Sequence, residues 1–288
     1  MWDAYNLRMK KIYLLLFFLV TANVLVAQDK ELLLLHTNDM HSRIEPFATD
    51  YADTVLADKG GMLRRANFIA LQRKNNENVL LFDSGDFCQG TPYYNMYKGQ
   101  VEVEMMNAMK YDAATIGNHE FDFGLSNMAR LFKMANFPIV CSNYDVTGTV
   151  LEGLVKDYVV LERAGMRIGV FGLSPTMEGL VPKAKYGDVK MKDPVVEATR
   201  VVEILRNVEK CDLVVCLSHL GWKTSNLYND KMLIKNTRGI DVVCGGHSHT
   251  YFKEPETLKN LDGQDVYVSQ MGKHGAFVGY MNIIMQKK

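Results

Sequence analysis

Short runs of apolar and β-branched residues alternate along the chain with longer segments in which apolar residues recur every three or four positions. The short runs predict strands at residues 31–35, 79–82, 113–116, 138–141, 159–161, 167–171, 213–217, 242–244, 266–269 and 277–285. The longer segments predict helices at residues 62–74, 102–110, 127–135 and 195–208. Several strands are apolar at every position, as expected for strands that are covered on both faces. The alternation predicts an α/β fold with a largely parallel sheet, and the hairpin-like run at residues 158–172 indicates mixed sheets, two of them packed face to face.

The N-terminal segment has a different pattern. Basic residues between positions 8 and 11 precede an apolar run at residues 12–26, which ends at the small residue Ala27. This order is typical of a secretory signal peptide, and the run is shorter than the roughly twenty residues that a membrane-spanning helix needs. We therefore predict a signal peptide at residues 1–27 and one mature domain at residues 28–288. Export to the periplasm or the extracellular space, with no membrane anchor after cleavage, follows from this prediction.

Composition narrows the class of protein. Hydrophobic residues make up 48% of the chain, an ordinary value for a globular protein. Lysine and arginine together number 33, as do aspartate and glutamate, so the chain lacks the basic surplus with which proteins bind nucleic-acid polymers. The five cysteines have no staple-like spacing. We expect Cys141, Cys216 and Cys244 to be buried in strands, and Cys88 to pack within its loop.

Histidines gather at the ends of the predicted strands. Five of the seven follow the carboxyl end of a strand and lie beside Asp, Asn or Gly: His41, His119, His219, His247 and His249. Such strand ends meet at one edge of an α/β sheet, where these folds bind ligands. Asp39 lies two residues before His41, so a carboxylate and an imidazole project to the same side. Asp86 follows Gly85 at the end of another strand.

The strand ends together offer a set of metal ligands. The candidates are Asp39, His41, Asp86, Asn118, His219, His247 and His249. Oxygen and nitrogen ligands without thiolate are compatible with Mn, Zn, Mg, Co or Fe, and the pattern leaves the metal open. Seven ligands are too many for one tetrahedral ion but are enough for two divalent ions that share a carboxylate. Two cations about 4 Å apart catalyse phosphoryl transfer in many enzymes, because they lower the pKa of a shared water and neutralise charge in the transition state.

These blocks, taken in order, resemble the calcineurin-like metallophosphoesterase superfamily. They are Asp39-x-His41, Gly85-Asp86, Gly117-Asn118-His119-Glu120, His219 and Gly246-His247-x-His249. The runs at residues 36–41, 85–91 and 118–122 resemble its 5′-nucleotidase branch, and the resemblance covers roughly residues 31–288. It implies a four-layer α/β/β/α sandwich of two mixed β-sheets, with the metals at the strand-end edge.

The resemblance also implies a role for each residue. One ion would be held by Asp39, His41, Asp86 and His249, and the other by Asp86, Asn118, His219 and His247. Asn118 and His119 would contact the substrate. His119 would assist the leaving group while Asp122 orients its ring. The implied activity is that of an exported dimetal phosphohydrolase in which a metal-bound hydroxide attacks a phosphate ester, most often of a nucleoside 5′-monophosphate or a related nucleotide.

The resemblance leaves the substrate open. The 5′-nucleotidase branch generally carries a C-terminal domain that binds the nucleoside, and this sequence stops at Lys288. One expectation is a separately encoded C-terminal nucleotidase domain that acts with this chain. The alternatives are a broad phosphomonoesterase, a 2′,3′-cyclic-nucleotide phosphodiesterase, or a non-catalytic binding module with a decayed metal site. The retained His119–Asp122 pair argues against the last of these.

Other polar residues near these blocks are expected to be structural. We expect His36 to be a satisfied core histidine, His274 a loop residue and Asp83 a hydrogen-bond anchor for its turn. Glu120 is expected to support the structure without acting in catalysis. Arg65 is expected to carry a solvated charge on its helix.

Overall fold

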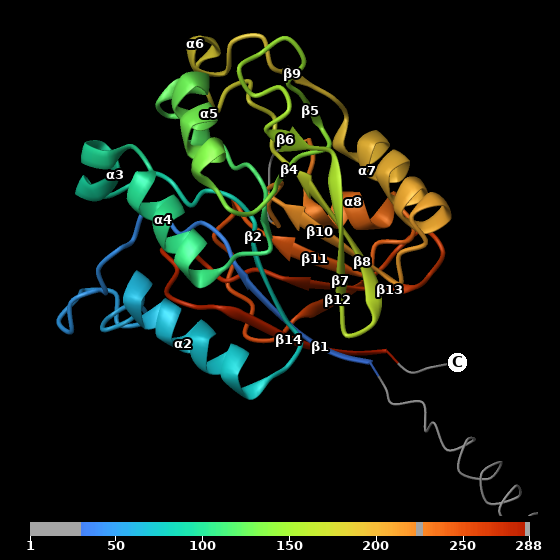
Figure 1. The fold of residues 1–288 in the computed structure, drawn as a ribbon, viewed down its shortest axis with the longest axis horizontal. Helices are drawn as coiled ribbons and strands as arrows, with labels where there is room; N and C mark the ends of the chain where they lie inside the picture. Colours follow the sequence, from blue (N-terminus) through green and yellow to red (C-terminus); the bar gives the residue numbers. More distant parts are fainter. Residues whose placement is uncertain (1–29, 223–226, 286–288) are drawn as a thin grey trace, which may run out of the picture. The chain divides into compact units, whose positions relative to one another are not determined.

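Two six-stranded β-sheets organise the computed structural model, which describes residues 30–222 and 227–285 (Figure 1). The signal peptide predicted at residues 1–27 lies outside the described residues. Within the described chain, Glu31–Ile283 form one compact unit. The helices of the described residues are all too short or too polar to cross a bilayer.

The first sheet combines five strands from the N-terminal half of the described chain with its last strand. Its strand order is β14-β1-β2-β3-β4-β6. The strands are β1 (Lys30–Thr37), β2 (Val79–Asp83), β3 (Ala113–Ala114), β4 (Ile139–Val140), β6 (Val155–Lys156) and β14 (Gly279–Met285). From β1 to β6 neighbouring strands are parallel, so the loops that follow β1, β2 and β3 leave the sheet at the same edge.

The second sheet is mixed. Its strand order is β12-β13-β11-β10-β8-β7. The strands are β7 (Tyr158–Arg163), β8 (Met166–Leu173), β10 (Leu213–Ser218), β11 (Val242–Gly245), β12 (Glu256–Lys259) and β13 (Asp265–Ser269). The four central strands are parallel, and the outer strands β7 and β12 pair antiparallel with their neighbours. A separate antiparallel pair joins β5 (Tyr144–Asp145) to β9 (Lys190–Met191).

Helices cover the outer face of each sheet (Figure 1). The first sheet lies beside α2 (Met62–Asn75), α3 (Pro92–Tyr97), α4 (Gln100–Met109) and α5 (Gly124–Met134). The second sheet lies beside α7 (Pro194–Glu203), which continues as a π-helical turn at Ile204–Val208, and α8 (Asp230–Lys235). A 3₁₀ turn at His119–Phe121 and the short α6 (Lys183–Tyr186) complete the described helices.

Each helix layer shares a hydrophobic core with its own sheet. Leu33 and Leu81 belong to the same buried cluster as Val103 of α4. Val214 belongs to a second cluster with Val201 of α7. Alternate strand residues point the other way and are also buried, so the sheets have two covered faces.

The two sheets meet closely along their inner faces. The Ser142 N–H donates to the Gly172 carbonyl at 2.8 Å, which links the end of β4 to β8. A Cβ added to Gly172 would lie only 2.1 Å from the Val140 carbonyl oxygen, so this approach requires glycine. The layer order is therefore α/β/β/α, and the predicted fold class is confirmed.

All the predicted strands and helices are present, with shifted ends. The predicted strand at residues 113–116 is only two residues long in β3, Ala113–Ala114. The patterns missed the shortest elements: α3, α6, α8, β5, β6, β9 and β12. Elements of two to six residues are too short for a period to be recognised. All five cysteines are free and buried, as expected for Cys141 directly after β4, for Cys216 and Cys244 in their strands and for Cys88 in its loop.

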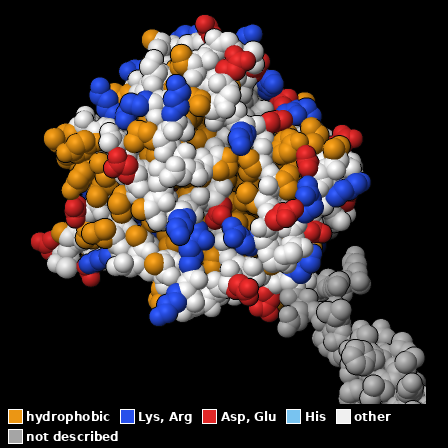
Figure 2. All heavy atoms as spheres, viewed as in Figure 1, with side chains coloured by type: hydrophobic (Ala, Val, Ile, Leu, Met, Phe, Trp, Pro, Cys, Tyr) orange, Lys and Arg blue, Asp and Glu red, His pale blue; other side chains and the backbone are white. Residues whose placement is uncertain are grey.

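The prediction for Arg65 was wrong. Its side chain is only 4% exposed, and it donates to the Met40 sulfur at 2.9 Å and to the Gly275 carbonyl at 3.1 Å. Arg65 lies on the buried face of α2 with Met62 and Ile69, three and four residues away. Solvated charges of both signs do occur elsewhere, interspersed over the face seen in Figure 2.

Candidate metal centre

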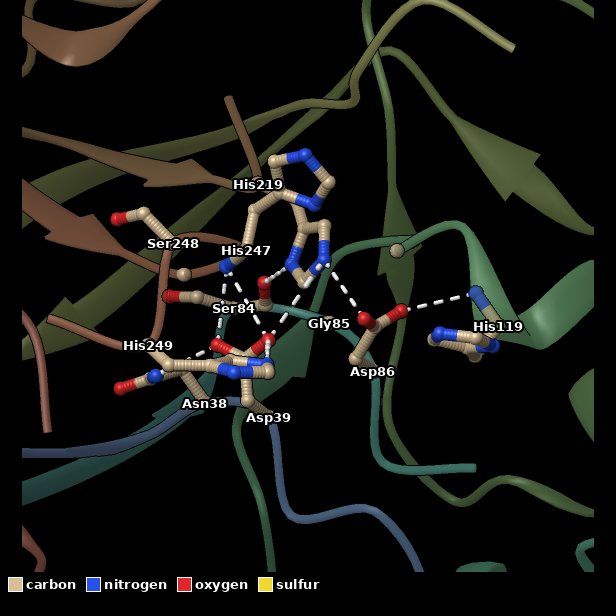
Figure 3. Close-up of polar contacts among 12 residues, drawn as sticks. Asn38, Asp39, Ser84, Gly85, Asp86, His119, His219, His247, Ser248 and His249 are labelled. Atoms are coloured by element: carbon tan, nitrogen blue, oxygen red, sulfur yellow. Dashed lines mark hydrogen bonds and ion pairs between the residues drawn. The ribbon is translucent and has the colours of Figure 1, made fainter. Parts of the chain in front are cut away.

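Six of the seven predicted ligands form groups of neighbouring ligand atoms at the strand-end edge of the two sheets. Asp39 and His41 follow β1, Asp86 follows β2 and Asn118 follows β3, whereas His219 follows β10, and His247 and His249 follow β11. Figure 3 shows carboxylates from the first sheet facing imidazoles from the second, with Asp86 between His219 and His119. The structure therefore brings together side chains that are up to 210 residues apart in sequence, Asp39 and His249 among them.

One group of ligand atoms is formed by Asp39, His41 and His249. The Asp39 Oδ1 atom lies 3.3 Å from His249 Nε2 and 3.7 Å from His41 Nε2. The two Nε2 atoms are 3.0 Å apart. At most one proton fits between two such nitrogens, so at least one nitrogen keeps a free lone pair. This lone pair and the Asp39 carboxylate lie close together, as the ligands of a cation do.

A second group is formed by Asp86, His219 and His247. His219 Nε2 lies 3.1 Å from Asp86 Oδ2, and the rings of His219 and His247 are 5.2 Å apart between centroids. His219 Nδ1 lies 2.6 Å from the Ser84 carbonyl oxygen, which can only accept a hydrogen bond. Nδ1 therefore carries a proton and Nε2 is left for the site, as is common for histidines that bind metals.

A buried atom without a partner marks the same place. Asn118 Oδ1 is buried and has no hydrogen-bond partner among the described residues. A buried acceptor without a partner costs about 1–3 kcal/mol, so such atoms ordinarily have one. The donor set, which holds oxygen and nitrogen and no thiolate, fits divalent cations.

The backbone at the candidate ligands is unusual. Asp39, His41, Asp86, His247 and His249 have φ values of 47°, 44°, 56°, 67° and 52°. Residues other than glycine rarely adopt this left-handed region, and when they do they cluster at functional sites where the surroundings hold them. The strain thus falls on five of the seven predicted ligands.

Glycine permits the close approach of the loops after β2 and β3. A Cβ added to Gly117 would lie 2.1 Å from Asp86 Oδ1, and one added to Gly85 would lie 2.6 Å from the Gly117 nitrogen. Gly85 also has a φ of 89°. Only glycines at both positions allow Asp86 and Asn118 to reach the same side of the site.

The histidines of the site differ in the direction of their pKa shifts: the pKa is raised for His219 and lowered for His247. Burial lowers the pKa of His219, but the adjacent Asp86 carboxylate outweighs it and raises that pKa to about 10. Burial opposes ionisation of Asp86 too, yet the neighbouring histidines, His219 first, hold the pKa of Asp86 below its usual range. Burial lowers the pKa of His247 to about 4, so this ring is neutral and ready to act as a ligand.

His119 lies on the other side of Asp86 (Figure 3). Its backbone N–H donates to Asp86 Oδ1 at 2.9 Å, and its Nδ1 lies 3.2 Å from both carboxylate oxygens of Asp122. The two side chains are 31% and 36% exposed, more than most of the predicted ligands. Burial lowers the pKa of His119, but the Asp122 hydrogen bond and the charge of Asp86 raise it overall.

His119 also lies close enough to His41 and Asp86 to form a third group of candidate ligand atoms. Its hydrogen bond to Asp122, however, gives it the geometry of an oriented acid or base. The structure is therefore compatible with the predicted division of labour, in which His119 faces the substrate.

The supporting acids behave as expected. Glu120 accepts hydrogen bonds from the backbone N–H groups of Asp86 at 3.0 Å, Cys88 at 3.2 Å and Gly117 at 2.6 Å. Asp83 accepts from the Thr37 hydroxyl at 2.6 Å and from the Gly85 N–H at 3.0 Å. Both carboxylates therefore hold the turns that present the ligands.

His36 differs from expectation, and His274 lies closer to the site than its loop position alone indicates. His274 is in a loop, as predicted, but its ring lies 5.8 Å from that of His41, and its N–H donates to the Asp39 carbonyl at 2.7 Å. It follows the end of β13, and this position after a strand is the sequence feature that could have placed His274 near the site. His36 is buried in β1, yet neither ring nitrogen has a partner among the described residues, so it is not the satisfied core histidine that was predicted.

Comparisons with known proteins agree with this geometry. A model of the calcineurin-like phosphoesterase family matches residues 32–251. The chain is 33% identical over 276 residues to a snake venom 5′-nucleotidase from Gloydius brevicauda, a match that covers 90% of this chain and 46% of that protein. It is 34% identical over 274 residues to the Homo sapiens 5′-nucleotidase, a match that covers 88% of this chain and 46% of that protein.

A solved structure is also similar. The 5′-nucleotidase precursor from Thermus thermophilus superposes with a TM-score of 0.78 at 30% identity, over 88% of this chain and 54% of that one. The chain thus spans about half the length of the curated relatives it matches. The region matched by the family model contains six of the seven histidines and every predicted ligand.

Proposed function

The chain belongs to the calcineurin-like phosphoesterase family, and on that premise we propose that it hydrolyses nucleoside 5′-monophosphates or related nucleotides at a site for two divalent cations. One cation is assigned to Asp39, His41, Asp86 and His249, and the other to Asp86, Asn118, His219 and His247. The observation that carries this proposal is the convergence of two ligand groups on either side of the paired carboxylates of Asp39 and Asp86.

The protein supplies position and charge to this reaction. When bound, divalent cations supply Lewis acidity, which lowers the pKa of water and neutralises the phosphoryl oxygens. Asp86 reaches both ligand groups, because its carboxylate lies within 4.8 Å of the His41 ligand atom and its Oδ2 faces His219. The spacing of the cations therefore depends on the placement of this one carboxylate.

His119 is the catalytic residue of the proposal. Asp122 accepts a hydrogen bond from His119 Nδ1, which leaves Nε2 free to face the substrate. The raised pKa of His119 favours the protonated ring. Nε2 then donates a proton to the leaving oxygen as the phosphorus–oxygen bond breaks.

The substrate assignment rests on the relatives, which are named 5′-nucleotidases. Nucleoside recognition by a separately encoded partner belongs to the same proposal. Such a partner is expected to lower the KM for AMP without changing that for p-nitrophenyl phosphate.

The test is a panel of phosphate esters assayed with Mn²⁺, Zn²⁺, Mg²⁺ and Co²⁺, before and after chelation. We expect phosphate release from AMP that stops on chelation and returns with metal. Cleavage of p-nitrophenyl phosphate or 2′,3′-cyclic AMP with no cleavage of AMP would reject the nucleotide assignment alone. No turnover of any ester with any metal would reject the phosphohydrolase.

Export is proposed from residues 1–27, whose charged start and short apolar run match a signal peptide. Expression of the full sequence should place the protein outside the cytoplasm with a new N-terminus at Gln28. Recovery of the uncleaved chain from the cytoplasm would reject export.

A further inference from the structure

The loop after β11, residues 246–250, presents two of the candidate ligands on an unusual backbone. His247 and His249 both adopt left-handed φ values, 67° and 52°, with Ser248 between them. Each of these conformations costs free energy, so neighbouring groups must hold the loop in place. On the first sheet the corresponding support is Glu120. On the second sheet the counterpart is Gln270.

Gln270 is fully buried directly after β13, and its amide contacts the loop at three points. Its Nε2 donates to the Gly246 carbonyl at 2.8 Å, just before His247. Its Oε1 accepts from the Thr250 N–H at 2.5 Å, just after His249, and from the Ser248 hydroxyl at 3.0 Å. The donor and acceptor ends of one amide thus hold both ends of the loop.

The same contacts extend to the loop that carries His219. The Ser248 hydroxyl, which donates to Gln270, accepts from the Trp222 N–H at 2.8 Å. Trp222 lies three residues after His219. One buried amide is therefore connected to both loops that carry the second sheet's candidate ligands.

We propose that Gln270 is a positioning residue for the two-cation site, which orients His247 and His249 toward Asp39 and Asp86. This inference rests on the proposed function, since it concerns the same site. An amide is required because the loop presents both a carbonyl and donor groups, and a carboxylate accepts without donating. His247 and His249 belong to different ligand groups, so loss of Gln270 affects the binding of both ions.

A role in fold stability alone is the competing explanation, and the chain offers a matched control. Asn260 is a buried amide, 7% exposed, in the hairpin between β12 and β13. Its Oδ1 accepts from the N–H groups of Asp262 at 2.9 Å and Gln264 at 3.0 Å, and so holds a turn that carries no predicted ligand. Asn260→Leu therefore removes an equivalent contact outside the site.

The experiment compares wild type, Gln270→Met and Asn260→Leu as metal-free proteins. Mn²⁺ stoichiometry and affinity are measured by competition with a fluorescent chelator, and Tm is measured on the same samples. We expect Gln270→Met to weaken the binding of both Mn²⁺ ions by roughly 10–100-fold, the usual effect of losing a partner that orients metal ligands. Asn260→Leu is expected to lower Tm with unchanged Mn²⁺ affinity.

The outcomes separate the inference from the function on which it rests. Wild-type binding of two ions together with unchanged affinity in Gln270→Met overturns the inference alone. Failure of the wild type to bind Mn²⁺ rejects the proposed function and the inference with it. If Gln270→Met does not fold, Gln270→Glu is measured instead. It keeps an acceptor for Thr250 and Ser248 but loses the donor to Gly246, and unchanged affinity in that variant also overturns the inference.

Discussion

The two sheets contribute different chemistry to one site. The first sheet supplies carboxylates, an amide and two imidazoles, from Asp39, Asp86, Asn118, His41 and His119. The second supplies imidazoles alone, from His219, His247 and His249. Carboxylates of the first sheet also contact imidazoles of the second, as in the 3.1 Å approach of His219 to Asp86 and the 3.3 Å approach of His249 to Asp39. Neither sheet alone holds a complete ligand group of the kind proposed, so the site depends on how the sheets pack.

The supporting residues differ in the same way. Glu120, on the first sheet, gathers three N–H donors, which an acceptor-only carboxylate satisfies. Gln270, on the second, faces a carbonyl and two donors, which only an amide satisfies. The comparison shows that each support is matched to the backbone groups that its loop presents.

The largest loss of activity is expected for a substitution at Asp86, where ligands from the two sheets meet. Asp86→Ala removes the carboxylate that reaches both ligand groups, so each cation loses affinity. Because bound cations supply several kcal/mol of transition-state stabilisation, kcat/KM for a phosphate ester should fall by roughly 10⁴-fold or more. Metal analysis of the purified variant checks this directly. His249→Ala, which disturbs one group, should retain one ion, and two tightly bound ions in Asp86→Ala would contradict the assigned bridge.

His119→Ala tests proton donation to the leaving group, a function to which only the first sheet contributes. Loss of a positioned general acid should lower kcat by roughly 10²–10⁴-fold. Metal stoichiometry should stay at the wild-type value, because His119 is not assigned as a ligand. Steady-state kinetics with matched metal analysis test the point, and unchanged turnover would remove His119 from the mechanism.

Glu120→Gln tests whether a carboxylate is needed on the first sheet. The amide places a donor against one of three backbone donors, so the Asp86 loop loses part of its support. Metal affinity should fall by roughly 10–100-fold. Chelator competition measures this loss, and an affinity equal to wild type would show that the 85–88 loop holds its shape without Glu120.

The smallest effect on activity is expected for Asp230→Asn, beneath the second sheet's loops. Asp230 is buried, accepts from the Ser218 hydroxyl at 2.5 Å, and burial raises its pKa from 3.8 to about 7. Between these values the folded state binds more protons than the unfolded state, so the free energy of unfolding falls as pH rises from about 4 to about 7. Asp230→Asn lacks this dependence. Its Tm relative to wild type, measured without metal, should therefore increase over that range, and a constant difference would contradict the raised pKa.

Much of the fold could be predicted from sequence because its signals are local. The runs around Leu33, Leu81 and Val214 are apolar at successive positions, which is enough to predict strands buried on both faces. Residues such as Asp86 and His219 could be recognised as candidates because they follow those runs directly. Their role as ligands stays a prediction that the metal analyses above test.

What was missed depends on distant partners. Arg65 has the sequence context of a surface charge, and its burial follows from acceptors on Met40 and Gly275. His274 lies beside His41 because β13 and β1 end at the same edge. Gln270 resembles any polar residue after a strand until the loop across from it is known. No local period records such contacts.

The sequence by itself determined the order of strands and helices, the kinds of side chain at each strand end, and the family. These features depend on neighbouring residues and on periods of two or 3.6 positions. Only the tertiary structure decided which atoms meet, such as His41 with His249 across the sheets, and which backbone groups are held by Glu120 and Gln270. The physical reason is that two sheets must pack before groups some 200 residues apart lie within the roughly 3 Å at which hydrogen bonds and metal ligands act.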